Sequence, residues 1–179
     1  MYKRQAKRRA FSTTVSISVV KGLDWEASLP LQLLVHGGGW VLQSEHYQDT
    51  MLKYLADHCD LTVLSVGYRL APEDPYPAGN EDCFDVGEYL VDNAEKDHGG
   101  PLLFMGGDSA GGHLSALTAF HLLKTRPDFA FKGLVLNFGA FDMSGFLPQA
   151  WSFKLPLVLD VEIMSKFISN LSEVSRASY

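Results

Sequence analysis

The stretch that decides the fold is Gly107-Asp108-Ser109-Ala110-Gly111, a GxSxG pattern. A short apolar run at residues 102–105 predicts a strand before it, and helical spacing over residues 110–124 predicts a helix after it. A serine on such a tight strand-to-helix turn is held in a strained backbone conformation, so its neighbours have to be small. The pattern therefore predicts that Ser109 is a nucleophile, with the Ala110 N–H beside it at the positive end of a helix.

A second glycine-rich stretch, His36-Gly37-Gly38-Gly39-Trp40, follows an apolar run at residues 31–35. Consecutive glycines let the backbone turn its amides toward a ligand with no side chains in the way. Acyl transfer needs two or three such donors, fixed in advance, for the oxyanion that develops. The stretch therefore predicts an oxyanion loop, and a flexible glycine loop is the alternative interpretation.

The rest of the chain continues the alternation of short strands and helices. Further strands are expected at residues 11–20, 61–66 and 134–136. Helical spacing joins one set of apolar residues after the glycine loop and another near the end of the chain: Tyr47, Met51, Tyr54 and Leu55, then Met164, Phe167, Ile168 and Leu171. This order predicts one α/β domain over residues 1–179, with a mostly parallel sheet and helices on both faces. Residues 1–10 are expected to be a basic tail.

A third motif is Tyr68-Arg69-Leu70-Ala71-Pro72-Glu73, a proline-containing turn after a strand. Arg69 and Glu73 could pair and hold the loop, so we expect the motif to be scaffolding rather than chemistry. HGGGW, YRLAPE and GDSAGG in this order resemble the hormone-sensitive-lipase-like branch of the α/β-hydrolases. The resemblance covers residues 30–145 well and extends to Leu171. It implies hydrolysis of small carboxylic esters with short to medium acyl chains, without a metal or an organic cofactor. The HGGGW form is also similar to kynurenine formamidase relatives of this fold, which cleave an amide.

The resemblance implies a role for each matching residue. Ser109 matches the nucleophile, and the N–H groups of Gly38, Gly39 and Ala110 match the oxyanion donors. His36 matches a histidine that shapes the glycine loop and transfers no proton. Asp108 and Glu73 match residues that support the elbow and the neighbouring loops. Residues 151–179 resemble part of the family's cap segment.

The base and the acid that should activate Ser109 are missing from the expected places. In this fold the chain order is Ser, then Asp or Glu, then His, yet all six histidines lie at or before position 121. His113 is expected to pack or face solvent, His98 to lie in a turn, and His46 to lack an acid partner. Asp142 is a weak candidate for the acid, with an ordinary turn residue as the alternative. The fold is therefore expected to be incomplete at its C-terminal end.

Two functions follow from this incomplete site. The first is a serine ester hydrolase that has negligible turnover as this chain alone, because a serine hydroxyl is a poor nucleophile without a base. The alternative is a non-catalytic binding or interaction protein that self-associates through an exposed sheet edge.

Charge and composition restrict the partners and the compartment. The net charge is −6, although five of the first ten residues are basic. The rest of the chain is therefore strongly acidic, which argues against nucleic acid as a partner. No apolar run is long enough to span a bilayer. Cys59 and Cys83 fall in expected helices, which predicts two small buried side chains and favours a reducing cytoplasmic setting. The basic N-terminus leaves mitochondrial targeting as the alternative.

Overall fold

The computed structural model describes residues 5–6, 15–22, 28–142 and 161–172. Its strands form one six-stranded sheet in the order β1-β2-β4-β3-β5-β6. The strands are β1 (Gln5–Ala6), β2 (Ser16–Lys21), β3 (Leu31–Val35), β4 (Thr62–Gly67), β5 (Leu102–Asp108) and β6 (Gly133–Asn137). The helices are α1 (Asp49–His58), α2 (Ala78–His98), α3 (Ala110–Thr125) and α5 (Val161–Leu171).

The sheet is parallel from β4 to β6 and antiparallel at β1 and β2. The expected α/β fold with a mostly parallel sheet is therefore confirmed. The antiparallel direction of β2 follows from its short connection to β3, because a strand that runs this way ends on the side of the sheet where β3 begins. β1 lies within the residues that were expected to form a basic tail.

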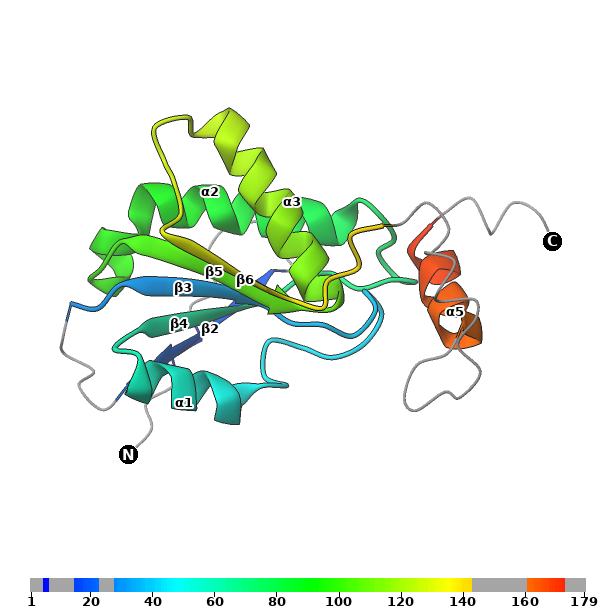
Figure 1. The fold of residues 1–179 in the computed structure, drawn as a ribbon, viewed down its shortest axis with the longest axis horizontal. Helices are drawn as coiled ribbons and strands as arrows, with labels where there is room; N and C mark the ends of the chain where they lie inside the picture. Colours follow the sequence, from blue (N-terminus) through cyan, green and yellow to red (C-terminus); the bar gives the residue numbers. More distant parts are fainter. Residues whose placement is uncertain (1–4, 7–14, 23–27, 143–160, 173–179) are drawn as a thin grey trace.

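Helices cover both faces of the sheet, with α2 and α3 on one face and α1 on the other (Figure 1). The larger core cluster lies between the sheet and α2 and α3, and it includes Leu33, Met105 and Leu114. The smaller cluster lies under α1 and includes Leu34 and Leu52. Leu33 and Leu34 are neighbours in β3 but belong to opposite clusters, because successive side chains of a strand point to opposite faces. This explains why β3 is an unbroken apolar run.

The helix expected after the glycine loop is present as α1, but most of the apolar residues at helical spacing are not its buried ones. Tyr47, Met51 and Tyr54 are exposed, whereas Leu52 and Ala56 are the buried residues of α1. The helix lies over β2 and β4 and buries only a narrow stripe, so Met51 and Tyr54 remain on its outer side.

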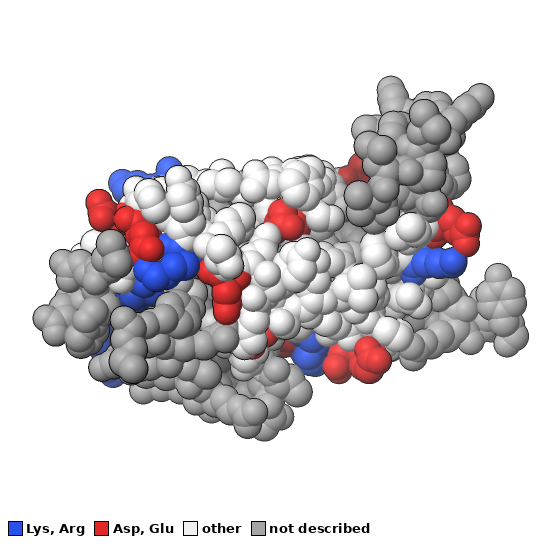
Figure 2. All heavy atoms as spheres, turned by 90° about the horizontal axis from the view of Figure 1, so that it is seen from below, with Lys and Arg blue, Asp and Glu red and all other residues white. Residues whose placement is uncertain are grey.

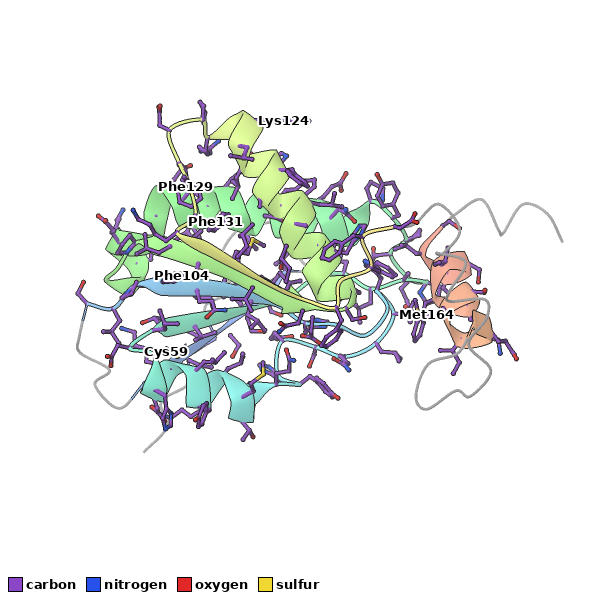
Figure 3. The ribbon with its side chains drawn as sticks, viewed as in Figure 1. Cys59, Phe104, Lys124, Phe129, Phe131 and Met164 are labelled. Atoms are coloured by element: carbon purple, nitrogen blue, oxygen red, sulfur yellow. The ribbon has the colours of Figure 1, made fainter. Side chains whose placement is uncertain are left out.

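One of the two cysteines also departs from the expectation. Cys83 is buried in α2, as predicted. Cys59 follows the last residue of α1 and is exposed, because the chain leaves the sheet surface there (Figure 3). None of the described helices is both long and apolar enough to cross a membrane.

Strand β6 forms one edge of the sheet in the described part of the chain. Its residues Leu134 and Val135 are exposed, as is Phe138 just beyond it. Phe120 and Leu123 add exposed apolar side chains on the neighbouring helix α3. Seen from the α1 side, a broad central area of the surface carries few charged side chains (Figure 2).

The carboxyl ends of the parallel strands point toward α5 (Figure 1). Figure 3 shows Met164 of α5 at this end of the molecule, and Cys59, Phe104 and Phe129 at the other. In open α/β sheets, ligands bind at the carboxyl ends of the strands. The loops that follow β3 and β5 are therefore in the position where a site is expected.

Candidate active site

Ser109 occupies a sharp turn between β5 and α3. Its backbone angles are φ 54° and ψ −119°, in the region that residues other than glycine rarely adopt, and α3 begins at the next residue, Ala110. Two backbone hydrogen bonds hold this conformation. The Ser109 N–H donates to the Asn137 carbonyl over 2.9 Å, and the Ser109 carbonyl accepts from the His113 N–H over 3.1 Å. Strained backbone that the surroundings enforce is typical of functional sites.

Close packing explains why small residues flank Ser109. A Cβ atom at Gly111 would overlap the carbonyl oxygen of Val35 and would lie 2.6 Å from that of His36. Val35 is the last residue of β3, and His36 follows it directly and accepts the Tyr68 hydroxyl at its carbonyl. A residue larger than glycine would therefore push α3 away from β3 and open the turn.

The glycine loop lies directly beside this turn. β3 and β5 are neighbouring parallel strands, with Val35 opposite Gly107, so the residues that follow each strand come together. Gly37 contacts Asp108 closely, since a Cβ atom at Gly37 would lie 2.8 Å from Asp108 Oδ2. The structure thus brings together the two stretches that the sequence singled out.

The loop itself turns through left-handed backbone. Gly38 and Gly39 have φ angles of 105° and 61°, and Trp40 follows at 64°. The N–H groups of Val41 and Leu42 both donate to the Gly38 carbonyl, over 3.2 and 3.0 Å. Both bonds are accepted by the Gly38 carbonyl, so they close the turn around Gly39 and Trp40.

His36 is buried at the base of the loop. Its Nδ1 lies 2.8 Å from the Gly37 carbonyl oxygen, and its ring stacks on Tyr68 with centroids 4.4 Å apart. The Tyr68 hydroxyl donates to the His36 carbonyl over 3.0 Å. Burial lowers the pKa of His36, so the ring is neutral at pH 7 and its Nδ1–H donates to Gly37. This placement suits a histidine that shapes the loop.

Asp108 joins the elbow to α1. Its Oδ1 accepts a hydrogen bond from Gln48 Nε2 over 3.0 Å. Gln48 immediately precedes α1, and sequence reasoning missed it. Nothing in the local sequence pairs Gln48 with a residue sixty positions later, and only the adjacency of the two loops does so.

The expected pairing of Arg69 with Glu73 was wrong. Arg69 Nε lies 3.0 Å from both carboxylate oxygens of Asp82, and the Arg69 backbone N–H donates to Asp82 Oδ2 over 2.8 Å. The hydrogen bond that the Arg69 side chain donates to Asp82 raises the pKa of Arg69. Glu73 is exposed and forms no ion pair with another described residue, and its role in supporting the loops stays a prediction. The Arg69–Asp82 pair fixes the loop to the first turns of α2.

His113 is held by contacts with other residues, and His98 lies far from Ser109. His113 Nδ1 lies 2.6 Å from the Ala140 carbonyl oxygen, and its ring meets Trp40 edge-on with centroids 5.5 Å apart. His113 therefore packs, as expected, and ties α3 to the loop after β6. His98 is the last residue of α2 rather than part of a turn, and it lies near the start of β5, at the opposite end from Ser109.

His46 has the acid partners that it was expected to lack. Its Nε2 lies 3.3 Å from Glu45 Oε1, and its Nδ1 lies 4.0 Å from Asp49 Oδ1. Glu45 also accepts a hydrogen bond from the Ser16 hydroxyl over 2.8 Å. Both ring nitrogens of His46 thus lie beside carboxylates.

Asp142 is exposed and follows the end of β6 by a few residues. Its assignment as the acid stays a prediction. Within the described ranges, no group of three or more His, Cys, Asp or Glu side chains could hold a metal ion. Of the expected cap-like segment, residues 151–160 and 173–179 lie outside the described residues, and the remainder forms α5 and the residue after it.

Comparison with known proteins agrees with this geometry. A family model described as alpha/beta hydrolase fold matches residues 32–173. The carboxylesterase NlhH of Mycobacterium tuberculosis is 41% identical over 93 residues, which are 51% of this chain and 29% of that protein. The ethyl acetate hydrolase of Pseudomonas putida is 31% identical over 143 residues, 79% of this chain and 45% of that protein.

The solved structures extend the likeness to almost all of the chain. A hyperthermophilic esterase from the archaeon Pyrobaculum calidifontis superimposes with a TM-score of 0.84 and 29% identity, over 99% of this chain and 57% of that one. The chain thus spans about half the length of its relatives, or less. From the family match, the relatives and the paired glycine loop and serine turn, it follows that this chain belongs to the hormone-sensitive-lipase-like branch of the α/β-hydrolase fold.

Proposed function

We propose that this chain carries the nucleophile and the oxyanion hole of a serine carboxylic ester hydrolase. The observation that supports this most is the backbone of Ser109, held at φ 54° between β5 and α3 and placed beside the glycine loop. A structural glycine turn would not need a serine in that conformation. The relatives named as carboxylesterase, carboxylic ester hydrolase and arylesterase support a small-molecule ester as the substrate.

The proposed reaction has two halves. Ser109 Oγ attacks the acyl carbon of the ester, and the carbonyl oxygen becomes an oxyanion that accepts hydrogen bonds from the N–H groups of Gly38, Gly39 and Ala110. The C–O bond to the alcohol then breaks, the alcohol leaves with a proton, and the acyl group stays on Ser109. Water attacks this acyl-serine ester in the second half and releases the carboxylic acid.

Removal of the proton from the Ser109 hydroxyl is the difficult step for this chain. All six histidines are described, and contacts with other residues include those of His36 with Gly37, His46 with Glu45, His58 with Tyr54, His113 with Ala140, and His121 with Glu88. His98 lies at the far end of β5, about 20 Å away along the strand. The structure shows no hydrogen bond between the Ser109 hydroxyl and any of these histidines, and we infer that this chain supplies no base for Ser109. Hydrolases that lack triad members keep only about 10³–10⁴-fold acceleration over water, so we expect negligible turnover from this chain alone.

Labelling with a fluorophosphonate probe tests the proposal, because the probe reacts with an activated serine in an oxyanion hole. The purified chain should label slowly, and added imidazole should accelerate the reaction by supplying the base from solution. Ser109→Ala should abolish both the labelling and its acceleration, whereas Ser44→Ala, at an exposed serine, should change neither. Equal labelling of the Ser109→Ala variant would show that this serine is not the nucleophile. Rapid p-nitrophenyl acetate turnover that depends on Ser109 would contradict the missing base.

A non-catalytic interaction protein is the second candidate, and the exposed strand β6 favours it. Leu134 and Val135 are 42% and 50% exposed on an edge strand without charged residues or proline. Natural sheet edges usually carry charged residues or proline, which prevent pairing with another chain. Under this proposal, two copies pair through β6 in solution.

A further inference from the structure

Helix α5 packs against the rest of the protein through one apolar face. The half-buried residues of the helix share apolar side chains: Ile163, Met164, Phe167, Ile168 and Leu171. Glu162, Ser165 and Lys166 are exposed, and Lys166 Nζ bonds Glu162 Oε1 over 2.7 Å on the outer side. Phe167 and Leu171 are four residues apart, so they lie one above the other on the same face of the helix.

Phe167 contacts the glycine loop. A Cβ atom placed on Gly39 would overlap the Phe167 ring, whose Cε2 would be 2.8 Å from it. The ring therefore packs directly on the Gly39 backbone. Gly39 is buried, and its φ of 61° is a conformation that glycine adopts without the cost that a side chain would add.

Leu171 anchors the other end of α5. Its carbonyl accepts a hydrogen bond from the Tyr76 N–H over 2.9 Å, and its side chain packs against the larger core cluster. Tyr76 belongs to the loop that leads into α2. The helix is thus fastened to one loop by Leu171 and presses on another through Phe167.

We propose that Phe167 is a positioning residue for the oxyanion loop: its ring holds Gly39 in the conformation that aims the Gly38 and Gly39 N–H groups at the reacting carbonyl. This inference rests on the proposed function for its catalytic meaning, although the contact itself does not. The loop has consecutive glycines, which have more backbone freedom to lose than other residues. Oxyanion donors are effective only when they need no reorganisation during the reaction. Phe167 supplies an external support that the loop's own hydrogen bonds do not.

Hydrogen exchange measures this support without any ligand. The reporters are the amides of Val41 and Leu42, which bond the Gly38 carbonyl. In Phe167→Ala, exchange at Val41 and Leu42 should accelerate about tenfold, the size expected for the loss of one packing contact of about 1.4 kcal/mol. Phe167→Leu, which keeps most of the contact, should restore most of the protection.

Two further variants separate loop support from a general loss of stability. Phe120→Ala removes the same side chain from an exposed position on α3, and it should leave exchange at Val41 and Leu42 unchanged. Leu171→Ala loosens the anchor of α5, and it should accelerate exchange at the same two amides. Unchanged protection at Val41 and Leu42 in Phe167→Ala would overturn the inference.

An arylboronic acid then links the loop to the proposed chemistry. Its trigonal boron accepts Ser109 Oγ, the hydroxyl proton passes to the buffer, and the tetrahedral boronate places an oxygen in the oxyanion hole. Phenylboronic acid binding, followed by ¹¹B NMR, should weaken about tenfold in Phe167→Ala, recover in Phe167→Leu and disappear in Ser109→Ala. If the native chain binds no boronate while Phe167→Ala still accelerates exchange, the proposed function fails and the loop support stands. If boronate binding depends on Ser109 but Phe167→Ala changes neither hydrogen exchange nor boronate binding, only the inference about Phe167 fails.

Discussion

Removal of the Asp82 carboxylate should destabilise the protein more than any other single charge change in the described helices. The Asp82 side chain is fully buried, with 0% exposure, and it accepts from the Arg69 backbone N–H and from Nε, with Arg69 Nη2 2.9 Å from Oδ1. Removal of one partner of a buried pair costs about 3–5 kcal/mol. The Arg69 side chain keeps 21% exposure and can regain some hydration, so we expect about 3 kcal/mol for Asp82→Ala.

Urea unfolding at pH 7 measures this loss. With a slope of about 2 kcal/mol per M, the midpoint should fall by roughly 1.5 M. Glu81→Ala is the matched control, because Glu81 lies 3.6 Å from the same guanidinium but is 59% exposed. It should cost less than about 0.5 kcal/mol. A loss below about 1 kcal/mol in Asp82→Ala, with an unchanged slope, would refute the assignment of Arg69–Asp82 as the pair that holds this loop.

Three further outcomes follow from the structure. Val135→Lys puts a charge on the exposed edge strand β6, so it should abolish any concentration-dependent self-association seen by sedimentation velocity, and persistent association would exclude β6 as the interface. The hydrogen bond from His121 lowers the pKa of Glu88 below its ordinary value of 4.5. The stability that this hydrogen bond contributes is therefore present above pH 4.5 and is lost as pH falls through the lowered pKa. Melting temperatures between pH 6 and 3 should fall less steeply in Glu88→Gln than in the native chain. Cys59 is exposed and should react with a thiol reagent at once, whereas Cys83 is fully buried, which raises its pKa, and should react only on unfolding; early reaction of both would contradict the burial of Cys83 in α2.

The elements around the site were predictable because their sequence signals are local. β3 matches its predicted range of residues 31–35, since an apolar run that ends in glycines marks both ends of a buried strand. The turn at Ser109 was equally visible, because strain and crowding there permit few residue types on either side.

Contacts between distant segments could not be read in the same way. The spacing of Tyr47, Met51 and Tyr54 correctly indicates a helix, but periodicity alone does not say which face the sheet covers. Arg69 has an acid nearby in the sequence, at Glu73, yet it pairs with Asp82, because a buried carboxylate gains more from a guanidinium than an exposed one does. The contact of Phe167 with Gly39 joins residues far apart in the chain, and no local pattern predicts it.

The hydrogen bond from the Ser109 N–H to the Asn137 carbonyl connects the proposed nucleophile to the last residue of β6. An edge strand with exposed side chains is among the first parts of a sheet to fray, and its opening costs far less than global unfolding. Each such opening would release the strained turn from one of its two backbone restraints. Under the proposed function, the local stability of β6 therefore contributes to how long Ser109 keeps the conformation from which it reacts, and a chain that covered this strand would also stiffen the turn.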